Sequence, residues 1–239
     1  MSKNTPTRFP KGVGTATAET AFGMLGMPNP FKYHVYADDF TIFGIDNWFV
    51  TDTSTGTPTY TVADTDGGVL AILNGTADND HQWLMSGTSA GAGESYTFET
   101  GKAVWFSTKI KISDATQSDF FAGLVIATAT DPVGTAPTDG IFFRKDDGDT
   151  NIDFVVTKDS TATTATAITT ASDDTFVELA FYYDGDSTIT YFVADVRAGT
   201  SVTTNLPDDE ELAIFYGLQN GEAAAKTLSL DWIFAAKER

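Results

Sequence analysis

The segment Leu228-Ser-Leu-Asp-Trp-Ile-Phe234 near the C-terminus decides the fold class of this chain. Its large apolar side chains fall on every second residue, at Leu228, Leu230, Trp232 and Phe234. A period of two residues places such a row on one face of a β-strand. We therefore expect the row to face a core, with Trp232 and Phe234 inside it.

Similar apolar rows recur from about Tyr36 onward: Val104, Phe106, Ile110 and Ile112; Ile152, Phe154 and Val156; Val177, Leu179, Phe181 and Tyr183; Ile189, Tyr191 and Val193; Leu212, Ile214, Tyr216 and Leu218. No segment shows the period of a long amphipathic helix. Turn-forming pairs separate the rows and predict hairpins, at Asp66-Gly67, Asp139-Gly140, Asp147-Gly148, Asp184-Gly185 and Asn220-Gly221. The pattern predicts an all-β fold, a two-sheet antiparallel β-sandwich of jelly-roll type over residues 37–239.

Residues 1–36 are rich in proline and glycine and show neither period, which predicts an extended N-terminal arm. Its basic and apolar side chains are the candidate partner-binding residues: Arg8, Phe9, Lys11, Phe22, Met24, Leu25, Met27 and Phe31. A permanently solvated linker does not need so many apolar side chains. The composition equally allows the arm to wrap around its own domain, so both interpretations stay open.

The charge is strongly negative and unevenly distributed. The chain of 239 residues has 33 acidic and 14 basic residues, a net charge of −19. Residues 1–34 carry +3, from Lys3, Arg8, Lys11 and Lys32 against Glu19. An acidic body repels polyanions, so we expect no direct binding of nucleic acid. No apolar run is long enough for a signal peptide or a membrane span, so no membrane partner is expected.

Catalytic and cofactor motifs are missing from the sequence. There is no cysteine, and the histidines are His34 and His81 alone. Neither histidine stands in a metalloprotease or nucleophile-elbow motif. An E-x-D-x-x-E run, which would aim several acids at one substrate, is absent. We therefore predict that the protein is not an enzyme and uses no cofactor. Asp78-Asn79-Asp80 before His81 could serve a metal or a sugar, but a turn capped by Asx side chains explains the same residues.

The nearest approach to a calcium loop is the alternating set Asp147, Asp149, Asn151 and Asp153. The glycine that an EF-hand needs at its sixth position is replaced by Ile152, and Lys158 stands where the bidentate glutamate belongs. A hairpin at Asp147-Gly148 is the simpler interpretation, and we predict no metal site.

Several stretches carry a resemblance to a known family: Asp114-Ala-Thr-Gln-Ser-Asp119, Asp139-Gly-Ile-Phe-Phe-Arg-Lys-Asp-Asp-Gly-Asp149, Phe181-Tyr-Tyr-Asp-Gly185, the ending from Gln219 to Arg239, and the leader Arg8-Phe9-Pro10. They resemble tailed-bacteriophage virion structural proteins with a concanavalin A-like jelly-roll body. The resemblance implies a head decoration or cement protein on the capsid exterior. It further implies synthesis in the host cytoplasm and the major capsid protein as partner, together with further copies of the chain itself.

Two functions follow as expectations. The first is capsid decoration, in which the arm and one sandwich face bind the outer surface of the capsid lattice. The alternative is a lectin-like carbohydrate-binding module of a phage head fibre or tail. In that case aromatic side chains such as Trp48, Trp83 and Tyr96 would stack on sugar rings, although the same residues could equally be core.

Overall fold

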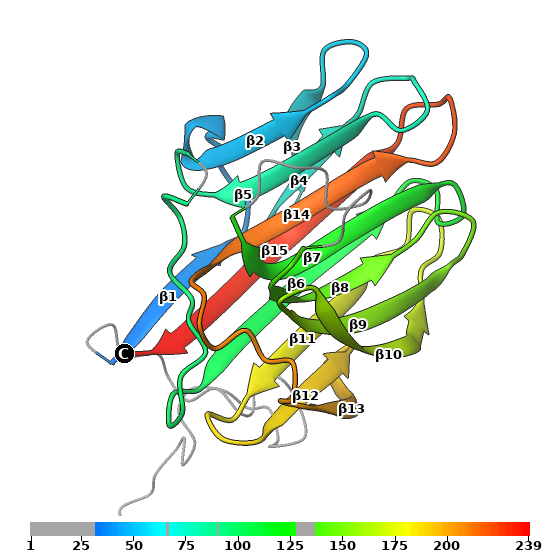
Figure 1. Ribbon diagram of the computed structural model, residues 1–239. Helices are drawn as coiled ribbons and strands as arrows, with labels where there is room; N and C mark the ends of the chain where they lie inside the picture. The colour runs from blue at the N-terminus through cyan, green and yellow to red at the C-terminus, as the bar shows by residue number, and fades with distance from the viewer. Residues whose placement is uncertain (1–31, 66, 90, 128–136) are drawn as a thin grey trace, which may run out of the picture.

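The computed structural model describes residues 32–65, 67–89, 91–127 and 137–239, and shows two antiparallel sheets packed face to face (Figure 1). The predicted β-sandwich is confirmed. Among the described residues the helical structure is a single 3₁₀ turn, η1 (Ile45–Asn47). No helix in these residues has the length and apolar composition to span a bilayer.

One sheet has eight strands, in the order β13-β12-β11-β6-β15-β4-β3 with β1 also paired to β15. Its strands are β1 (Tyr33–Asp38), β3 (Thr59–Thr65), β4 (Gly67–Leu73), β6 (Val104–Ile112), β11 (Val177–Tyr183), β12 (Thr188–Val193), β13 (Val196–Val202) and β15 (Thr227–Glu238). The other sheet has seven strands, in the order β10-β9-β8-β7-β14-β5-β2. These are β2 (Trp48–Asp52), β5 (His81–Ser86), β7 (Ser118–Ile126), β8 (Gly140–Lys145), β9 (Asn151–Lys158), β10 (Thr161–Thr170) and β14 (Leu212–Asn220).

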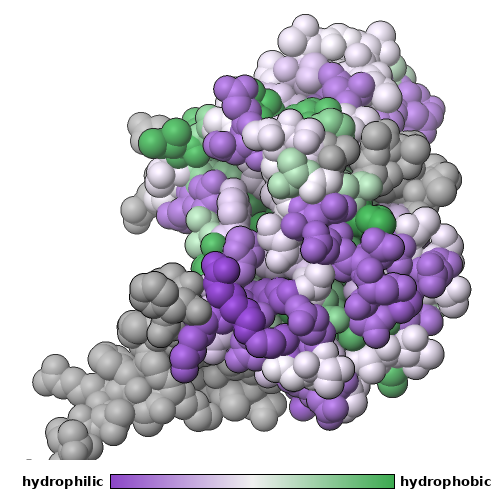
Figure 2. Space-filling model, turned by 60° about the vertical axis from the view of Figure 1, so that its left-hand side comes forward, coloured by the Kyte–Doolittle hydropathy of each residue, from purple (hydrophilic) through white to green (hydrophobic). Residues whose placement is uncertain are grey.

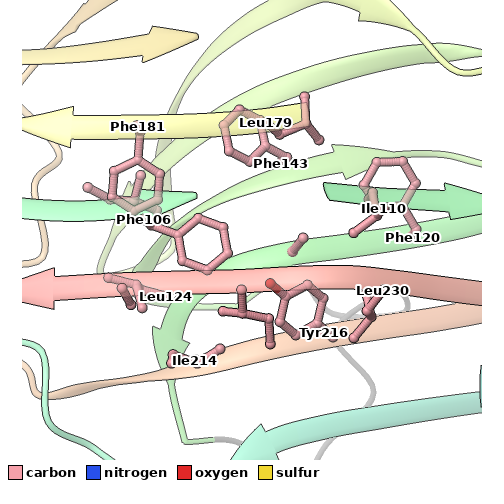
Figure 3. Close-up of a cluster of buried hydrophobic side chains, with 14 of the residues drawn as sticks. Phe106, Ile110, Phe120, Leu124, Phe143, Leu179, Phe181, Ile214, Tyr216 and Leu230 are labelled. Carbon is pink, nitrogen blue, oxygen red and sulfur yellow. The ribbon is translucent and has the colours of Figure 1, made fainter. Parts of the chain in front are cut away.

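The core lies between the two sheets and follows the predicted rows. Phe106, Phe143, Phe181 and Tyr216 converge there from four strands (Figure 3). The rings of Phe106 and Phe181 stack with centroids 5.4 Å apart. Each fully buried aromatic or aliphatic side chain of this kind contributes roughly 1.5–3 kcal/mol to folding. The rows on β6, β9, β11, β12 and β14 are confirmed as inward-facing.

The prediction that Leu228, Leu230, Trp232 and Phe234 share the core face is only half correct. Leu228 and Leu230 lie in the core, but Trp232 and Phe234 point outward and are partly exposed. The cause is an irregularity in the pairing of β15 with β6 between Leu230 and Trp232. An extra residue at a β-bulge shifts the alternation by one, so Ile233 and Ala235 enter the core instead.

Four of the five predicted hairpin turns lie in connections between paired neighbours. Gly67, Gly148 and Gly185 have positive φ values of 78°, 75° and 82° and join β3 to β4, β8 to β9 and β11 to β12. Asp139-Gly140 ends the connection between the paired strands β7 and β8, but Gly140 does not have a positive φ. The prediction is wrong at Asn220-Gly221, where the chain crosses from one sheet to the other.

Strand β1 covers residues 33–36 of the predicted arm, since its pairing with β15 begins at Tyr33 opposite Glu238. Lys32 is the first residue described. The surface of the sandwich is largely polar, and on the side shown in Figure 2 hydrophobic residues appear as small separate patches among hydrophilic ones.

Candidate functional site

The outer face of the seven-stranded sheet, opposite the core, carries a second apolar layer. Its central strands β5, β7 and β14 are buried on both faces, so they are nearly continuous apolar runs in the sequence. The layer consists of Trp83, Met85, Phe121, Val125, Phe142, Val155, Ala213 and Phe215. A sandwich sheet that simply faces water alternates apolar and polar residues, so this face is specialised.

Trp83 is the centre of this layer. Its indole stacks on Phe215 with centroids 6.0 Å apart and meets Phe121 edge-on at 6.0 Å. Phe121 in turn lies 5.7 Å from Phe142. We call these four rings the aromatic floor. It crosses the sheet from β5 to β8, and the register places Gly217 directly between Trp83 and Phe121.

A row of three polar side chains borders the aromatic floor. Asp119 on β7 pairs with Gln219 on β14, and Gln219 pairs with His81 on β5, so all three point to the same face. We call them the polar row. His81 stacks on Trp83 with centroids 4.7 Å apart, and its Nδ1 lies 3.1 Å from the Thr53 hydroxyl.

Asp119 is a buried acid, with 7% of its surface exposed. One carboxylate oxygen accepts a hydrogen bond of 2.7 Å from the backbone N–H of Asp147. Burial nevertheless dominates and raises the pKa of the Asp119 carboxyl to about 6. Perturbed acids of this kind occur preferentially at functional sites. On the next strand Lys145 is fully buried on the core side, and burial lowers its pKa.

Two buried polar atoms next to His81 have unused hydrogen-bonding capacity. Within the described residues neither the indole Nε1 of Trp83 nor the amide Oε1 of Gln219 has a hydrogen-bond partner. The amide nitrogen of Gln219 donates to Asn79 Oδ1 at 3.1 Å. A buried polar group without a partner costs about 1–3 kcal/mol, so a donor and an acceptor left open on two neighbours of His81 suit a hydroxyl-bearing ligand.

The outer face also opens into a pocket of about 230 Å³ over β8, β9 and β10. Phe142 and Val155 form its apolar base, and its polar groups come from Arg144, Thr157, Ser160 and Thr164. Arg144 Nε lies 3.0 Å from the Asp146 carboxylate. Since Phe142 belongs to the aromatic floor, whose four residues are 1–3% exposed, the pocket adjoins the buried layer that contains Trp83.

The aromatic residues expected to stack on sugars separate into two groups. Trp48 and Tyr96 lie in the core, whereas Trp83 lies on the outer face. The predicted arm residues Arg8, Phe9, Lys11, Phe22, Met24, Leu25, Met27 and Phe31 lie outside the described residues. Partner binding by the arm, the capsid protein as partner and a virion location therefore stay predictions.

The two loops considered for metal binding have their oxygens engaged elsewhere. Asp149 accepts from the Asn151 N–H at 3.0 Å, and Asp153 accepts from the Ala167 N–H at 2.8 Å. Asp80 accepts from the Ala77 N–H at 2.9 Å, as expected of a capped turn. In the described ranges no three His, Asp or Glu side chains form a group suited to a metal ion.

No family model and no curated protein match this sequence. Solved structures do match. A protein of unknown function, SO2946 from Shewanella oneidensis MR-1, has a TM-score of 0.57 at 17% identity, covering 87% of each chain. The endo-β-1,4-glucuronan lyase from the fungus Trichoderma reesei has a TM-score of 0.56 at 8% identity, covering 84% of this chain and 94% of its own. A prokaryotic β-1,3-1,4-glucanase (lichenase) from a mouse hindgut metagenome has a TM-score of 0.55 at 15% identity, covering 84% of this chain and 98% of its own.

The fold is a concanavalin A-like jelly roll. Further neighbours are glycoside hydrolases of family 16 and a carbohydrate recognition domain, so several of the structures that share this fold are carbohydrate-active or carbohydrate-binding proteins. They give no support to the capsid role. At identities of 8–17% the likeness in the three structures described above establishes the fold alone.

The prediction that this protein is not an enzyme is wrong, because the fold does not exclude enzymatic activity. The same fold carries a glucanase and a lyase, so activity on carbohydrates is open to this chain. The sequence argument required several acids on one strand. It missed Asp119 on the outer face, a carboxyl whose pKa is raised by burial to about 6.

Asp119 and Gln219 are thus the residues that sequence reasoning overlooked. Each is a polar residue near the end of a strand that is otherwise mostly apolar on both faces: Ser118-Asp-Phe-Phe-Ala-Gly-Leu-Val125 and Leu212-Ala-Ile-Phe-Tyr-Gly-Leu-Gln219. Polar side chains are seldom buried on such strands without a purpose, and this was the available signal.

Proposed function

We propose that this protein binds carbohydrate on the outer face of the seven-stranded sheet. The observation that carries the proposal is the pocket over β8–β10, with its apolar base at Phe142 and its ring of guanidinium and hydroxyl groups. Ligand sites combine an apolar lining with a few placed polar groups. The volume of about 230 Å³ is below the roughly 300–1,000 Å³ of sites for drug-sized ligands, so it suits one sugar ring.

The aromatic floor and the polar row extend this site beyond the pocket. Trp83 lies on β5, three strands from β8, which is roughly 14 Å at the usual strand spacing. A ligand that contacts both ends therefore has several sugar rings. Its hydroxyls could accept from Trp83 Nε1 and donate to Gln219 Oε1, the two atoms with unused capacity. Both atoms are buried, so contact with a ligand requires the surrounding side chains to move.

Charge selects the class of carbohydrate. A chain with a net charge of −19 repels uronate-containing and sulfated glycans. The nearest cation on this face, Arg144, is already paired with Asp146. Neutral glycans are therefore the preferred ligands. The names of the neighbours do not decide between the two classes, since a β-1,3-1,4-glucanase and a β-1,4-glucuronan lyase are both among them, so charge carries this step.

The test is a titration of the full chain with neutral β-glucan oligosaccharides, alongside a uronate oligosaccharide of equal length. We expect saturable binding of the neutral ligand. Thr157→Val removes a pocket hydroxyl and should weaken that binding about 3- to 10-fold, the value of one hydrogen bond.

The matched control is Thr190→Val. Thr190 is also a buried threonine on the outward side of the strand next to an edge, but in the eight-stranded sheet. Equal losses in both variants, or binding of no glycan at all, would reject the proposal. Assay of the same mixtures for new reducing ends reports whether binding leads to cleavage.

A further inference from the structure

The two sheets end side by side on one flank of the sandwich. β10 is the edge strand of the seven-stranded sheet, and β13 is the edge strand of the eight-stranded sheet (Figure 1). The two strands are in contact across the flank. In the described residues each pairs on one side alone, β10 with β9 and β13 with β12. Their outer edges therefore present unpaired backbone groups.

The two edge strands of this flank contain no acidic residue. β10 has the sequence TATTATAITT, with no charged residue and no proline, and β13 has a single charge, Arg197. Natural edge strands are usually protected by charges, proline or bulges. Here the only such device on β10 is the irregularity between Ala165 and Thr169, which leaves Thr161–Ala165 in regular pairing with β9.

The flank also exposes apolar surface. Val196 and Val202 on β13 have 66% and 58% of their surface exposed, two of the most exposed large apolar residues described. Near the start of β10, Asp208 and Asp209 are both ion-paired with Lys158, at 2.5 and 3.0 Å. Lys158 thus offsets one of these two negative charges, and a partner that approaches β10 meets a net charge of −1 from the three residues.

We propose that the flank is a self-association surface, on which β10 pairs antiparallel with β10 of a second copy of this chain. Two copies that each carry −19 repel one another over most of their surfaces, and β10 and β13, which have no acidic residue, are strands where that repulsion is weak. Pairing about a twofold axis at Thr163 sets Ala162 of each copy opposite Thr164 of the other. Threonine and alanine are small enough to meet across such a ladder, and each copy satisfies the open edge of the other.

Pairing at this edge has a consequence for the candidate site. Ala162 and Thr164 also line the pocket over β8–β10. A twofold axis through β10 would place the pockets of two copies next to each other on one continuous sheet. The dimer would thus offer a longer binding surface than one chain alone. The dimer itself does not depend on the proposed binding of carbohydrate.

The test is light scattering coupled to gel filtration on the full chain, loaded at about 100 µM without glycan. We expect a mass near 51 kDa, twice the 25.6 kDa of the chain. The double variant Ala162→Glu/Thr164→Glu sets carboxylates opposite carboxylates and should weaken dimerisation by about tenfold or more. Because both positions are exposed, the variant should keep the circular dichroism spectrum of the wild type.

The matched control is Thr59→Glu/Thr61→Glu, which adds the same charges to two exposed positions on β3, the edge strand of the opposite flank. This variant should remain a dimer. A monomer of 25.6 kDa in the wild type, or equal dissociation in the two double variants, would overturn the proposal.

Discussion

The indole of Trp83 lies directly over the backbone of Gly217, so closely that a Cβ atom on Gly217 would be 2.0 Å from Trp83 Cε3. Gly217→Ala should therefore displace the indole or destabilise the fold, at a cost of about 1–3 kcal/mol. Urea unfolding followed by tryptophan fluorescence measures both effects. Gly44→Ala is the control, because Gly44 has an extended backbone and its added Cβ would meet one side-chain atom at 3.2 Å. Equal stability of the two variants would contradict this placement of Trp83.

Because of the bulge in β15, Leu230 and Trp232 differ in burial, although they are only two residues apart. Leu230 is fully buried in the core, so Leu230→Ala should cost about 2–5 kcal/mol. Trp232 is larger but points outward, so Trp232→Ala should cost less than Leu230→Ala. Chemical denaturation of the two variants gives the comparison. A larger loss at Trp232 would mean that the alternation runs unbroken through Asp231.

Asp119 should make stability depend on pH. Its folded pKa of about 6 is above the roughly 3.9 of an unfolded aspartate, so the folded chain holds this proton more tightly. The contribution of Asp119 is then most favourable below about pH 4 and is lost as the pH rises through about 6. Asp119→Asn keeps the shape and cannot titrate.

The measurement is the urea midpoint of both proteins from pH 4 to pH 7. We expect the wild type to lose stability relative to Asp119→Asn as the pH rises over this window. All other titratable groups are present in both proteins, so their effects cancel in the comparison. Parallel curves would show that Asp119 titrates normally.

Folding should be independent of calcium. The carboxylates of Asp149 and Asp153 accept backbone N–H groups within their own hairpins, and the oxygens point to different partners. The melting temperature should be the same in EDTA and in excess calcium. A fall in EDTA that Asp149→Ala abolishes would locate an ion in this loop.

The sequence predicted the sandwich because its strand rows are long and regular: Phe106, Phe181 and Tyr216 each lie in the core as the alternation requires. It could not predict the bulge at Asp231, because the apolar residues of the sequence continue to alternate through Trp232 and Phe234 as they would in a regular strand. It also could not predict the candidate site. Trp83, Asp119 and Gln219 come from three strands that are far apart in the sequence and adjacent only through sheet order. Trp48 and Trp83 look alike in sequence, and only the register shows which of them faces outward.

The central claim is that carbohydrate binds on the outer face of the seven-stranded sheet, and Trp83 tests it most directly. Trp83→Phe keeps an aromatic ring and removes the indole N–H that has no partner in the described residues. Trp105→Phe makes the same change on the outer face of the eight-stranded sheet, where Trp105 Nε1 also lacks a partner. Calorimetric titration with a neutral β-glucan oligosaccharide should give saturable binding, weakened about 5- to 10-fold by Trp83→Phe and unchanged by Trp105→Phe. Binding that survives Trp83→Phe intact, or that Trp105→Phe removes instead, would contradict the account.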